Sequence, residues 1–218
     1  MKTSFGSRGR CYKCYRPKSS CICGYINSFD TDTKFVILMH PKEFKKVKNG
    51  TGHMTHLLLK NSELFVGVDF TNHNRINEII KEYESFVLYP SKDALNLSTT
   101  SLKLQKKMAL FIVDATWSCS LKILRDSKNI QMLPSVSFTT SKLSQFKIKQ
   151  QPQDFCLSTI ESTLCILELL DKYGIEDIQK ANLQGFLEPF EKMIEYQQKI
   201  IANPLSNAVR FKKRDKSK

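Results

Sequence analysis

Four cysteines near the start of the chain have the types and the spacing of a metal site. Cys11, Cys14, Cys21 and Cys23 follow the pattern C-x2-C-x6-C-x-C. Two close pairs of thiolates joined by a short turn can surround one zinc ion tetrahedrally, as in many structural zinc sites. We therefore predict a zinc-binding lobe over residues 1–30, and a redox role for the same cysteines is the alternative.

A second chemical candidate is the sequence DATW, which follows an apolar run. Residues 109–113 have the composition of a buried strand, and Asp114 comes directly after them. In open parallel sheets, ligands bind in the crevice beyond the carboxyl ends of the strands. Asp114 is therefore a candidate site residue, together with Thr116 and Trp117. The simpler interpretations are an N-cap for Asp114 and core packing for Trp117.

The elements that must position these residues form an alternating pattern of strands and helices. Short runs rich in Val, Ile, Phe and Leu have little alternation, which is typical of strands buried on both faces of a parallel sheet. Helix-capable segments lie between them, so we predict βαβ units and an α/β fold with a mostly parallel sheet. The predicted strands are 34–40, 64–68, 86–90, 109–114 and 136–139, and the predicted helices between them are 54–60, 74–85 and 119–127.

The last third of the chain is predicted to be helical. Ser158 and Glu161 have the spacing of a capping box, and Gly174 is a plausible stop for the helix that they begin. A second, longer helix is expected over residues 175–201, kinked at Pro189. These C-terminal helices complete a main domain over residues 31–205, and residues 206–218 are expected to be a disordered basic tail.

Charge is concentrated at the two ends of the chain. The formal net charge of the 218 residues is +13. Residues 1–20 carry six basic side chains and no acid, and residues 210–218 carry six basic side chains and Asp215, so the 189 residues between them carry about +2. Basic ends suit a polyanionic partner, because Lys and Arg neutralise phosphates, although they could also serve only for solubility. No apolar run is long enough for a membrane span and no secretory signal is recognisable, so a cytoplasmic location is expected.

Several short motifs occur in the order of a known family. They are the cysteine cluster, HPKE, TGHMTHLLLKNS, LYPSKDA, DATW with Lys122, LPSVSFT and QPQDFCLSTIES. Over roughly residues 11–161 this series resembles the DTW-domain family, the tRNA-uridine aminocarboxypropyltransferases. The chain departs from the family pattern at Gly50 for Asn, at Ser120 for Ala, and at Lys147 and Lys149 in place of Arg. Lys keeps the charge of Arg but loses its bidentate geometry.

The resemblance implies both a fold and an activity. The fold would be similar to the SPOUT class, with a deep trefoil knot. The activity would be transfer of the 3-amino-3-carboxypropyl group from S-adenosylmethionine to the imide nitrogen of a uridine in tRNA, with methylthioadenosine as the other product. The alternatives are a methyltransferase that uses S-adenosylmethionine on RNA and a non-catalytic, zinc-containing RNA-binding protein. A monomer is expected.

The resemblance also implies roles for particular residues. Asp114 would accept the imide proton or orient the uracil. Thr116 would hydrogen-bond the base or the amino-acid end of the substrate, and Trp117 would stack on the uracil or attract the sulfonium. The cofactor would contact Tyr89, Pro90, Ser91, Leu133, Pro134, Leu157, Ser158 and Thr159. Contacts with RNA are expected from Arg10, Arg16, His40, Lys122, Lys147, Lys149, Lys212, Lys213 and Arg214, although His40 could instead organise its loop.

Overall fold

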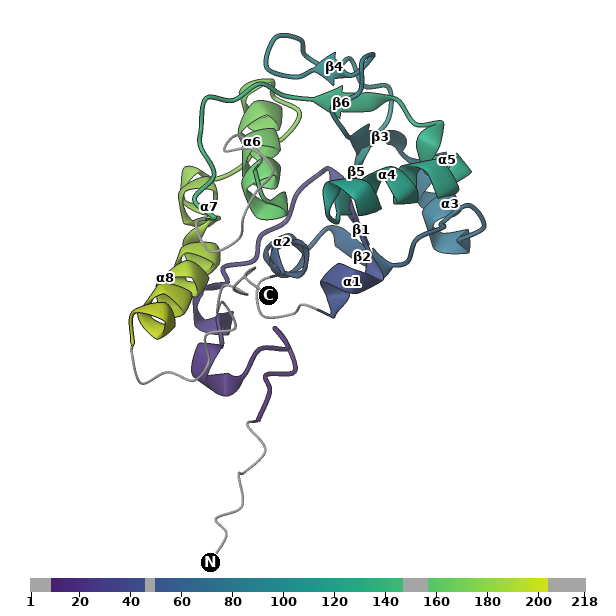
Figure 1. Ribbon diagram of the computed structural model, residues 1–218. Coiled ribbons are helices and arrows are strands. Elements are labelled where there is room, and N and C mark those ends of the chain that lie inside the picture. The colour runs from purple at the N-terminus through teal and green to yellow at the C-terminus, as the bar shows by residue number, and fades with distance from the viewer. Residues whose placement is uncertain (1–8, 46–49, 147–156, 204–218) are drawn as a thin grey trace, which may run out of the picture.

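A computed structural model describes residues 9–45, 50–146 and 157–203. Its centre is a six-stranded parallel sheet with the strand order β2-β1-β5-β3-β6-β4 (Figure 1). The strands are β1 (Lys34–Met39), β2 (Ser62–Val66), β3 (Glu84–Leu88), β4 (Leu95–Asn96), β5 (Met108–Asp114) and β6 (Ser135–Ser137). The predicted α/β class and the five predicted strands are confirmed. The two-residue strand β4 was not predicted, and the knotted topology stays a prediction.

The inner strands are buried on both faces, as their continuous apolar sequences indicate. β1 and β5 are parallel neighbours, with Phe35 opposite Leu110 and Met39 opposite Asp114. All of Phe35, Leu110 and Phe111 are fully buried. Because side chains alternate along a strand, the two faces carry separate clusters, one that includes Phe35 and Leu110 and one that includes Phe111. This burial accounts for the absence of polar alternation in the sequence.

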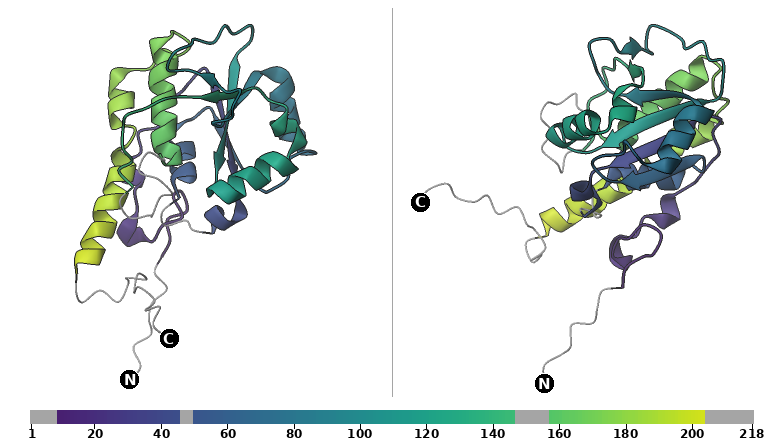
Figure 2. Two further views of the ribbon diagram at one scale, coloured as in Figure 1. Left: turned by 45° about the horizontal axis from the view of Figure 1, so that its top comes forward. Right: turned by 90° about the vertical axis from the view of Figure 1, so that its right-hand side faces the viewer.

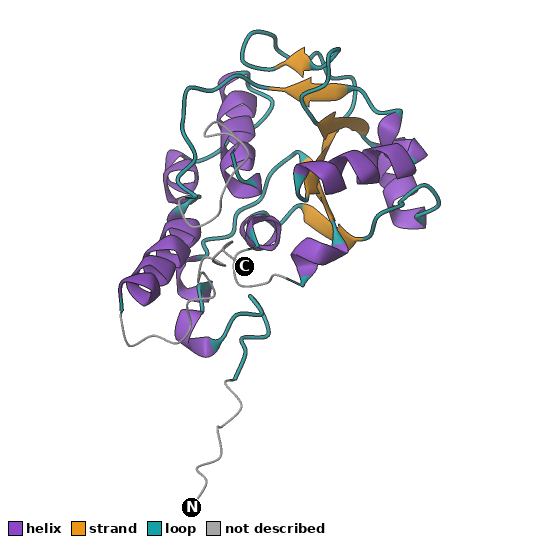
Figure 3. Cartoon of the chain, viewed as in Figure 1, coloured by secondary structure: helices purple, strands orange, loops and turns teal. Residues whose placement is uncertain are grey.

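Helices cover both faces of the sheet (Figures 2 and 3). One face packs α3 (Asn74–Glu82), α4 (Trp117–Asp126) and α5 (Lys128–Gln131), and the other packs α2 (Thr51–Leu58), α6 (Thr159–Lys172), α7 (Lys180–Gly185) and α8 (Glu188–Ala202). The short α1 (Pro41–Phe44) follows β1 directly. The three helices predicted between the strands are confirmed as α2, α3 and α4, with shifted ends. None of the helices that the structure describes is both long and apolar enough to cross a lipid bilayer.

The C-terminal helices differ in part from the prediction. The capping box is present, with Ser158 as N-cap and Glu161 bonded back to it, and Gly174 has the positive φ of +67° that suits a helix end. The prediction of a single helix over residues 175–201 is wrong, because two helices, α7 and α8, occupy this region. Pro189 lies in the first turn of α8 and begins that helix instead of kinking it, since the first turn has no need of the missing amide hydrogen.

A buried carboxylate ties this C-terminal region to the start of the sheet. Glu176 is 5% exposed, and its two oxygens accept hydrogen bonds from the backbone amides of Asp32 at 2.9 Å and Thr33 at 2.5 Å. Burying a carboxylate is costly unless its oxygens are paired, and here both are. The chain therefore enters β1 at a position fixed by the segment between α6 and α7.

Candidate functional site

A cavity of about 480 Å³ lies beyond the carboxyl ends of β3, β5 and β6. This is the edge at which parallel α/β sheets bind their ligands. Its wall consists of residues from the end of β3 and the loop after it, from β5 and the first turn of α4, from the end of β6 and the segment after it, and from the start of α6. They are Leu88, Tyr89, Pro90, Ile112, Val113, Ala115, Trp117, Ser120, Ser137, Phe138, Thr139, Thr140, Leu157, Thr159 and Ser162.

Trp117 stands at this cavity and not in the core. It is the first residue of α4 and is 45% exposed, so the interpretation as core packing is wrong. Its ring centroid lies 6.4 Å from that of Tyr89, with the planes inclined at 59°. Two aromatic rings on one wall of a cavity can hold a flat ligand by stacking. Thr116, the exposed N-cap of α4, precedes Trp117 at this point.

Asp114 ends β5 and is buried directly behind the cavity wall. The residue is 6% exposed, and its Oδ1 accepts a hydrogen bond of 2.6 Å from the hydroxyl of Thr159, which lines the cavity. The N-cap of α4 is Thr116, so the interpretation of Asp114 as that cap is wrong. The carboxylate of Asp114 therefore does not line the cavity itself, and its connection to the cavity is the hydrogen bond from the hydroxyl of Thr159.

Glycine is required where α2 passes this carboxylate. A Cβ atom added at Gly52 would lie 2.5 Å from both Cγ and Oδ2 of Asp114, closer than such atoms approach each other. The backbone of β5 is held as well, because the amide of His40 donates to the carbonyl of Asp114 at 3.1 Å. Asp114 is thus enclosed by α2, the β1–α1 junction and the start of α6.

The first turn of α6 is fixed by a second buried carboxylate. Glu161 is 5% exposed and accepts hydrogen bonds from the amide and hydroxyl of Ser158, from the amide of Gln145 and from the hydroxyl of Ser144. The four bonds span 2.5 to 2.9 Å. The capping box therefore does more than begin the helix, because it fixes the backbone of Thr159 next to Asp114.

The structure brings together half of the residues predicted to hold the cofactor. Tyr89, Pro90, Leu157 and Thr159 line the cavity. Ser158 is buried next to it, Ser91 shares a hydrogen bond with Ser135, Leu133 packs against the core, and the carbonyl of Pro134 accepts from the amide of Val87 at 3.0 Å. Phe138, Thr140 and Ser162 were missed. Phe138 and Thr140 lie at the end of the predicted strand 136–139 and just after it, and Ser162 lies in the first turn of a capped helix, so their positions in these elements were the available signal.

The cysteine cluster has the geometry that a tetrahedral zinc site requires. The four Sγ atoms all lie within 4.8 Å of one another, with 3.6 Å between Cys11 and Cys23 and 3.7 Å between Cys14 and Cys21. A tetrahedron with zinc–sulfur bonds of about 2.3 Å has edges of about 3.8 Å. Backbone hydrogen bonds from Cys14 and Lys13 lower the pKa of the Cys11 thiol to about 6, whereas burial and the neighbouring thiols raise the pKa of Cys23, and the pKa of Cys21 is raised as well. The predicted clustering is confirmed, and the four thiolates fit zinc.

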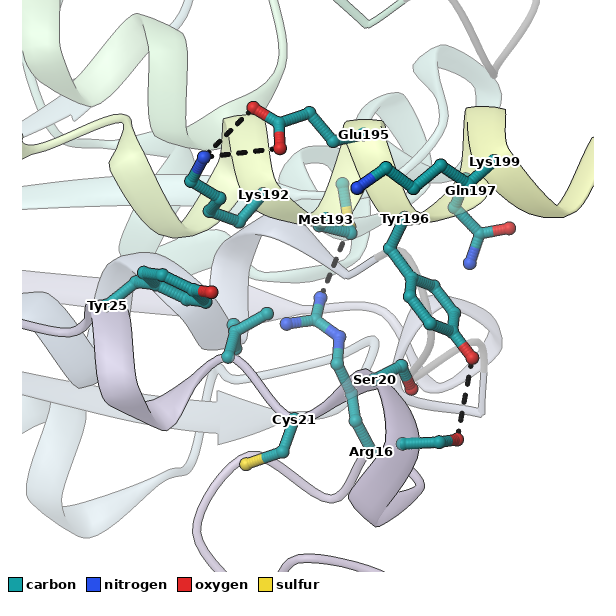
Figure 4. A pocket seen from close by; sticks show the side chains of 12 residues that line it. Arg16, Ser20, Cys21, Tyr25, Lys192, Met193, Glu195, Tyr196, Gln197 and Lys199 are labelled. Carbon is teal, nitrogen blue, oxygen red and sulfur yellow. Dashed lines mark hydrogen bonds and ion pairs between the residues drawn. The ribbon is translucent and has the colours of Figure 1, made fainter.

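The cysteine knuckle, residues 9–25, is docked on α8 (Figure 4). Arg16 is only 3% exposed, and its Nη2 donates to Sδ of Met193 at 3.3 Å, beside a cavity of about 180 Å³. The hydroxyl of Tyr196 donates to that of Ser19 at 3.4 Å. Burial lowers the pKa of Arg16, and the charges of Cys14, Cys21 and Cys23 oppose this change. The positive charge of the buried Arg16 thus lies close enough to the cysteine sulfurs to offset negative charge on them. A side chain buried in this way is not available for the predicted contact with RNA.

The remaining residues predicted to contact RNA are in different environments. Arg10 is exposed on the knuckle, and Lys122 on α4 is half-exposed and paired with Asp126 at 2.7 Å. His40 is 6% exposed and its Nδ1 accepts from the amide of Lys42 at 3.1 Å, so it organises the start of α1. Lys147, Lys149, Lys212, Lys213 and Arg214 lie outside the described residues.

The start of α2 connects the knuckle with the carboxylate of Asp114. His53, the residue after Gly52, stacks on Tyr15 of the knuckle with ring centroids 5.0 Å apart and planes inclined at 19°. Burial, together with the neighbouring His56 and Arg16, lowers the pKa of His53 to about 4, so the ring is neutral near pH 7. One turn of helix therefore contacts the cysteine knuckle on one side and the candidate active site on the other.

Comparison with known proteins gives a consistent family assignment. A family profile described as the DTW domain matches residues 8–198. The chain is 27% identical over 196 residues to tRNA-uridine aminocarboxypropyltransferase 2 of Macaca fascicularis, and 26% identical to the Mus musculus protein of that name. Each match covers 87% of this chain and 64% of the relative, so the chain spans less than two thirds of their length. The Drosophila melanogaster protein of that name is 27% identical, over 87% of this chain and 75% of the relative. No solved structure matches.

The first prediction concerns the metal. Purified protein should contain about one zinc ion per chain, because four thiolates close a structural site. Cys14→Ser should lose the zinc and lower the melting temperature. Cys165→Ser, at a buried cysteine outside the cluster, should keep it. Elemental analysis and melting curves of the three proteins provide the measurement. Metal-free wild-type protein that is fully folded would contradict the prediction.

A second prediction tests the contact between α2 and β5. Gly52→Ala should destabilise the protein by about 1–3 kcal/mol, because the added methyl group overlaps the Asp114 carboxylate and the surrounding core is closely packed. Gly185→Ala is the matched control, since a Cβ there meets nothing within 4 Å and a helical alanine is slightly favourable. Denaturant unfolding of both variants measures the difference. Equal stability of the two would show that Asp114 can move without cost.

Proposed function

Because the chain belongs to the DTW domain family, we propose that it transfers the 3-amino-3-carboxypropyl group of S-adenosylmethionine to the imide nitrogen of a uridine in tRNA. Methylthioadenosine would be the second product. The names of the relatives and the cavity at the strand ends support this proposal. The observation that carries it is the Thr159–Asp114 hydrogen bond, which links a hydroxyl in the cavity wall to a buried carboxylate.

The cavity suits a ligand of the proposed kind in size and lining. Its volume of about 480 Å³ is within the range of small-molecule sites, roughly 300–1,000 Å³. Tyr89, Pro90 and Leu157 offer apolar contact for an adenine ring and its ribose, and Thr139 and Thr140 offer hydroxyls for a polar amino-acid group. When bound, S-adenosylmethionine would supply a carbon activated by a sulfonium.

Attack by uracil on that carbon requires removal of the proton from its imide nitrogen. The hydroxyl of Thr159 can accept this proton while it passes its own to Asp114, with which it already forms a hydrogen bond of 2.6 Å. The nitrogen–carbon bond forms as the carbon–sulfur bond breaks, and the electron pair of the latter stays on sulfur. Asp114 then returns the proton to solvent. In this proposal Asp114 is the proton acceptor and Thr159 is the relay.

The aromatic wall would hold the other reactant. Trp117 is 45% exposed and Tyr89 lies beside it, so a uracil ring can stack at this position. Thr116, the exposed N-cap next to Trp117, would hydrogen-bond the edge of the base. Stacking sets the height of the ring and the hydroxyl sets its rotation. Together they place one nitrogen in line with one carbon, which is how an enzyme selects among three electrophilic carbons.

The decisive test of the proposed function is the identity of the product. tRNA incubated with the zinc-loaded protein and S-adenosylmethionine should yield a uridine heavier by one aminocarboxypropyl group, with methylthioadenosine in equal amount. Mass spectrometry of the digested nucleosides and chromatography of the small molecules measure both. A methylated nucleoside with S-adenosylhomocysteine would contradict the proposal in favour of a methyltransferase. Binding of tRNA without any product would contradict it in favour of a non-catalytic RNA-binding protein.

The proton path makes a separate prediction. Asp114→Asn should lower the single-turnover rate by about 100-fold to 10,000-fold, the usual contribution of a positioned acid or base. Thr159→Val keeps the shape of the side chain and removes the hydroxyl, so it should lower the rate by a similar factor, whereas Thr159→Ser should retain most of it. The double variant should be no slower than either single variant, because the two groups act as one unit.

Two control measurements separate chemistry from folding. Asp114→Asn keeps an oxygen that can accept from Thr159, so its melting temperature should stay close to that of the wild type. Affinity for S-adenosylmethionine, measured by calorimetry, should change little in all three single variants. A folded Thr159→Val protein with a wild-type rate would remove Thr159 from the proton path.

A further inference from the structure

Tyr12 has an unusual environment for an aromatic side chain. It lies in the turn between Cys11 and Cys14 and is 95% exposed, the highest value among the large hydrophobic side chains that the structure describes. Within the described part of the chain it forms no hydrogen bond or ring contact. A fully exposed ring contributes nothing to the core, so the packing of the protein does not explain Tyr12.

The surroundings of Tyr12 are basic. Residues 9–25 contain four basic side chains and no acidic one. Arg10, Lys13 and Lys18 are exposed, and Arg16 is buried beside the thiolates. The exposed face of the knuckle is therefore an aromatic ring with cationic groups on either side. Surfaces that bind single-stranded nucleic acid combine these two features, with stacking on the base and attraction to the backbone.

The turn that carries Tyr12 is held firmly at its base. The amide of Cys11 donates to the carbonyl of Arg16 at 2.8 Å, and the amide of Lys18 donates to that of Gly9 at 3.0 Å. The Arg16 guanidinium anchors the knuckle on α8 (Figure 4). Tyr15 anchors it on α2 through the stack with His53. A ring on a fixed turn loses little freedom when a ligand stacks on it, which favours binding.

We propose that Tyr12 is a stacking platform for an unpaired RNA base, with Arg10 and Lys13 on the adjacent phosphates. The proposal deepens the proposed function, on which it rests for the choice of RNA, by assigning a second RNA contact away from the catalytic cavity. The knuckle would then recognise a single-stranded part of the substrate, since bases in a duplex do not present their faces. RNA is favoured over a protein partner because the knuckle carries four basic side chains and no acidic one, and lysine is depleted in protein interfaces, although tyrosine and arginine are enriched there.

Binding of short RNAs tests this proposal without any catalytic step. Fluorescence anisotropy would compare a labelled single-stranded RNA with a duplex of the same sequence, using zinc-loaded, full-length protein and no S-adenosylmethionine. Tyr12→Ala should weaken single-strand binding by about 5-fold to 150-fold, the contribution of one base–aromatic stack. It should leave duplex binding unchanged. Tyr12→Phe keeps the ring and should bind as the wild type does.

Two further variants separate stacking from charge and from general surface change. Lys13→Ala should lower the magnitude of the salt slope for the single strand by about 0.7, the value for one phosphate contact. Met132→Ala removes another highly exposed side chain, 85% exposed at the end of α5, and should change neither affinity nor slope. Unchanged single-strand affinity in a folded, metal-loaded Tyr12→Ala protein would overturn the proposal and direct attention to a protein partner. Equal loss for single strand and duplex would overturn it too.

The outcome is independent of the transfer reaction. Single-strand binding that depends on Tyr12, in a protein that yields no modified nucleoside, would support the platform and contradict the proposed function. Transfer to tRNA, together with RNA binding that does not depend on Tyr12, would support the proposed function and contradict the platform.

Discussion

The buried carboxylate of Asp114 is the constraint on which the arrangement around the cavity depends. Taking a carboxylate out of water is costly, and the cost is tolerable only when protein groups replace the lost hydration. Here Thr159 at the start of α6 supplies a hydrogen bond, and α2 approaches so closely that only glycine fits at position 52. Three elements far apart in the sequence are therefore held at one point, the carboxyl end of the central strand β5.

The consequences extend outward from that point in both directions. Towards the cavity, Glu161 fixes the first turn of α6 with four hydrogen bonds and so holds the backbone that carries Thr159. Towards the metal lobe, the residue after Gly52 stacks on Tyr15. A structural change in the cysteine knuckle would thus be transmitted to α2, the helix that packs against Asp114. Through this contact the cysteine knuckle is connected physically to the helix that borders Asp114.

Features that depend on residues close in sequence could be predicted. The strands are short apolar runs, the capping box is a pattern of four residues, and the four cysteines lie within 13 residues of one another. The parallel sheet followed from the missing alternation, because it reflects burial on both faces. Asp114 and Trp117 could be identified as site candidates because they follow a predicted parallel strand, and ligands bind beyond the carboxyl ends of such strands.

Features that depend on distant residues could not be predicted. The partner of Asp114 is 45 residues away, and nothing in the sequence around Thr159 indicates which carboxylate it meets. The burial of Arg16 depends on α8, 177 residues further along the chain, so a basic residue in a basic segment was expected on the surface. The division between α7 and α8 was missed because a proline inside an apolar helical pattern can either kink a helix or begin one.

The position of β5 between β1 and β3 has a consequence for the growing chain during translation. β1 and β2 are neighbours and can pair as soon as residue 66 has left the ribosome, but the neighbours of β3 are β5 and β6. β3 is therefore synthesised with two unpaired edges. Its apolar residues Phe86 and Val87 have no partner strand until β5 is made, and β5 begins 20 residues after the end of β3 at Leu88. Unpaired apolar strands are the segments that associate wrongly. Until residue 114, the end of β5, has been synthesised, both edges of β3 stay unpaired, and this interval exposes the chain to aggregation.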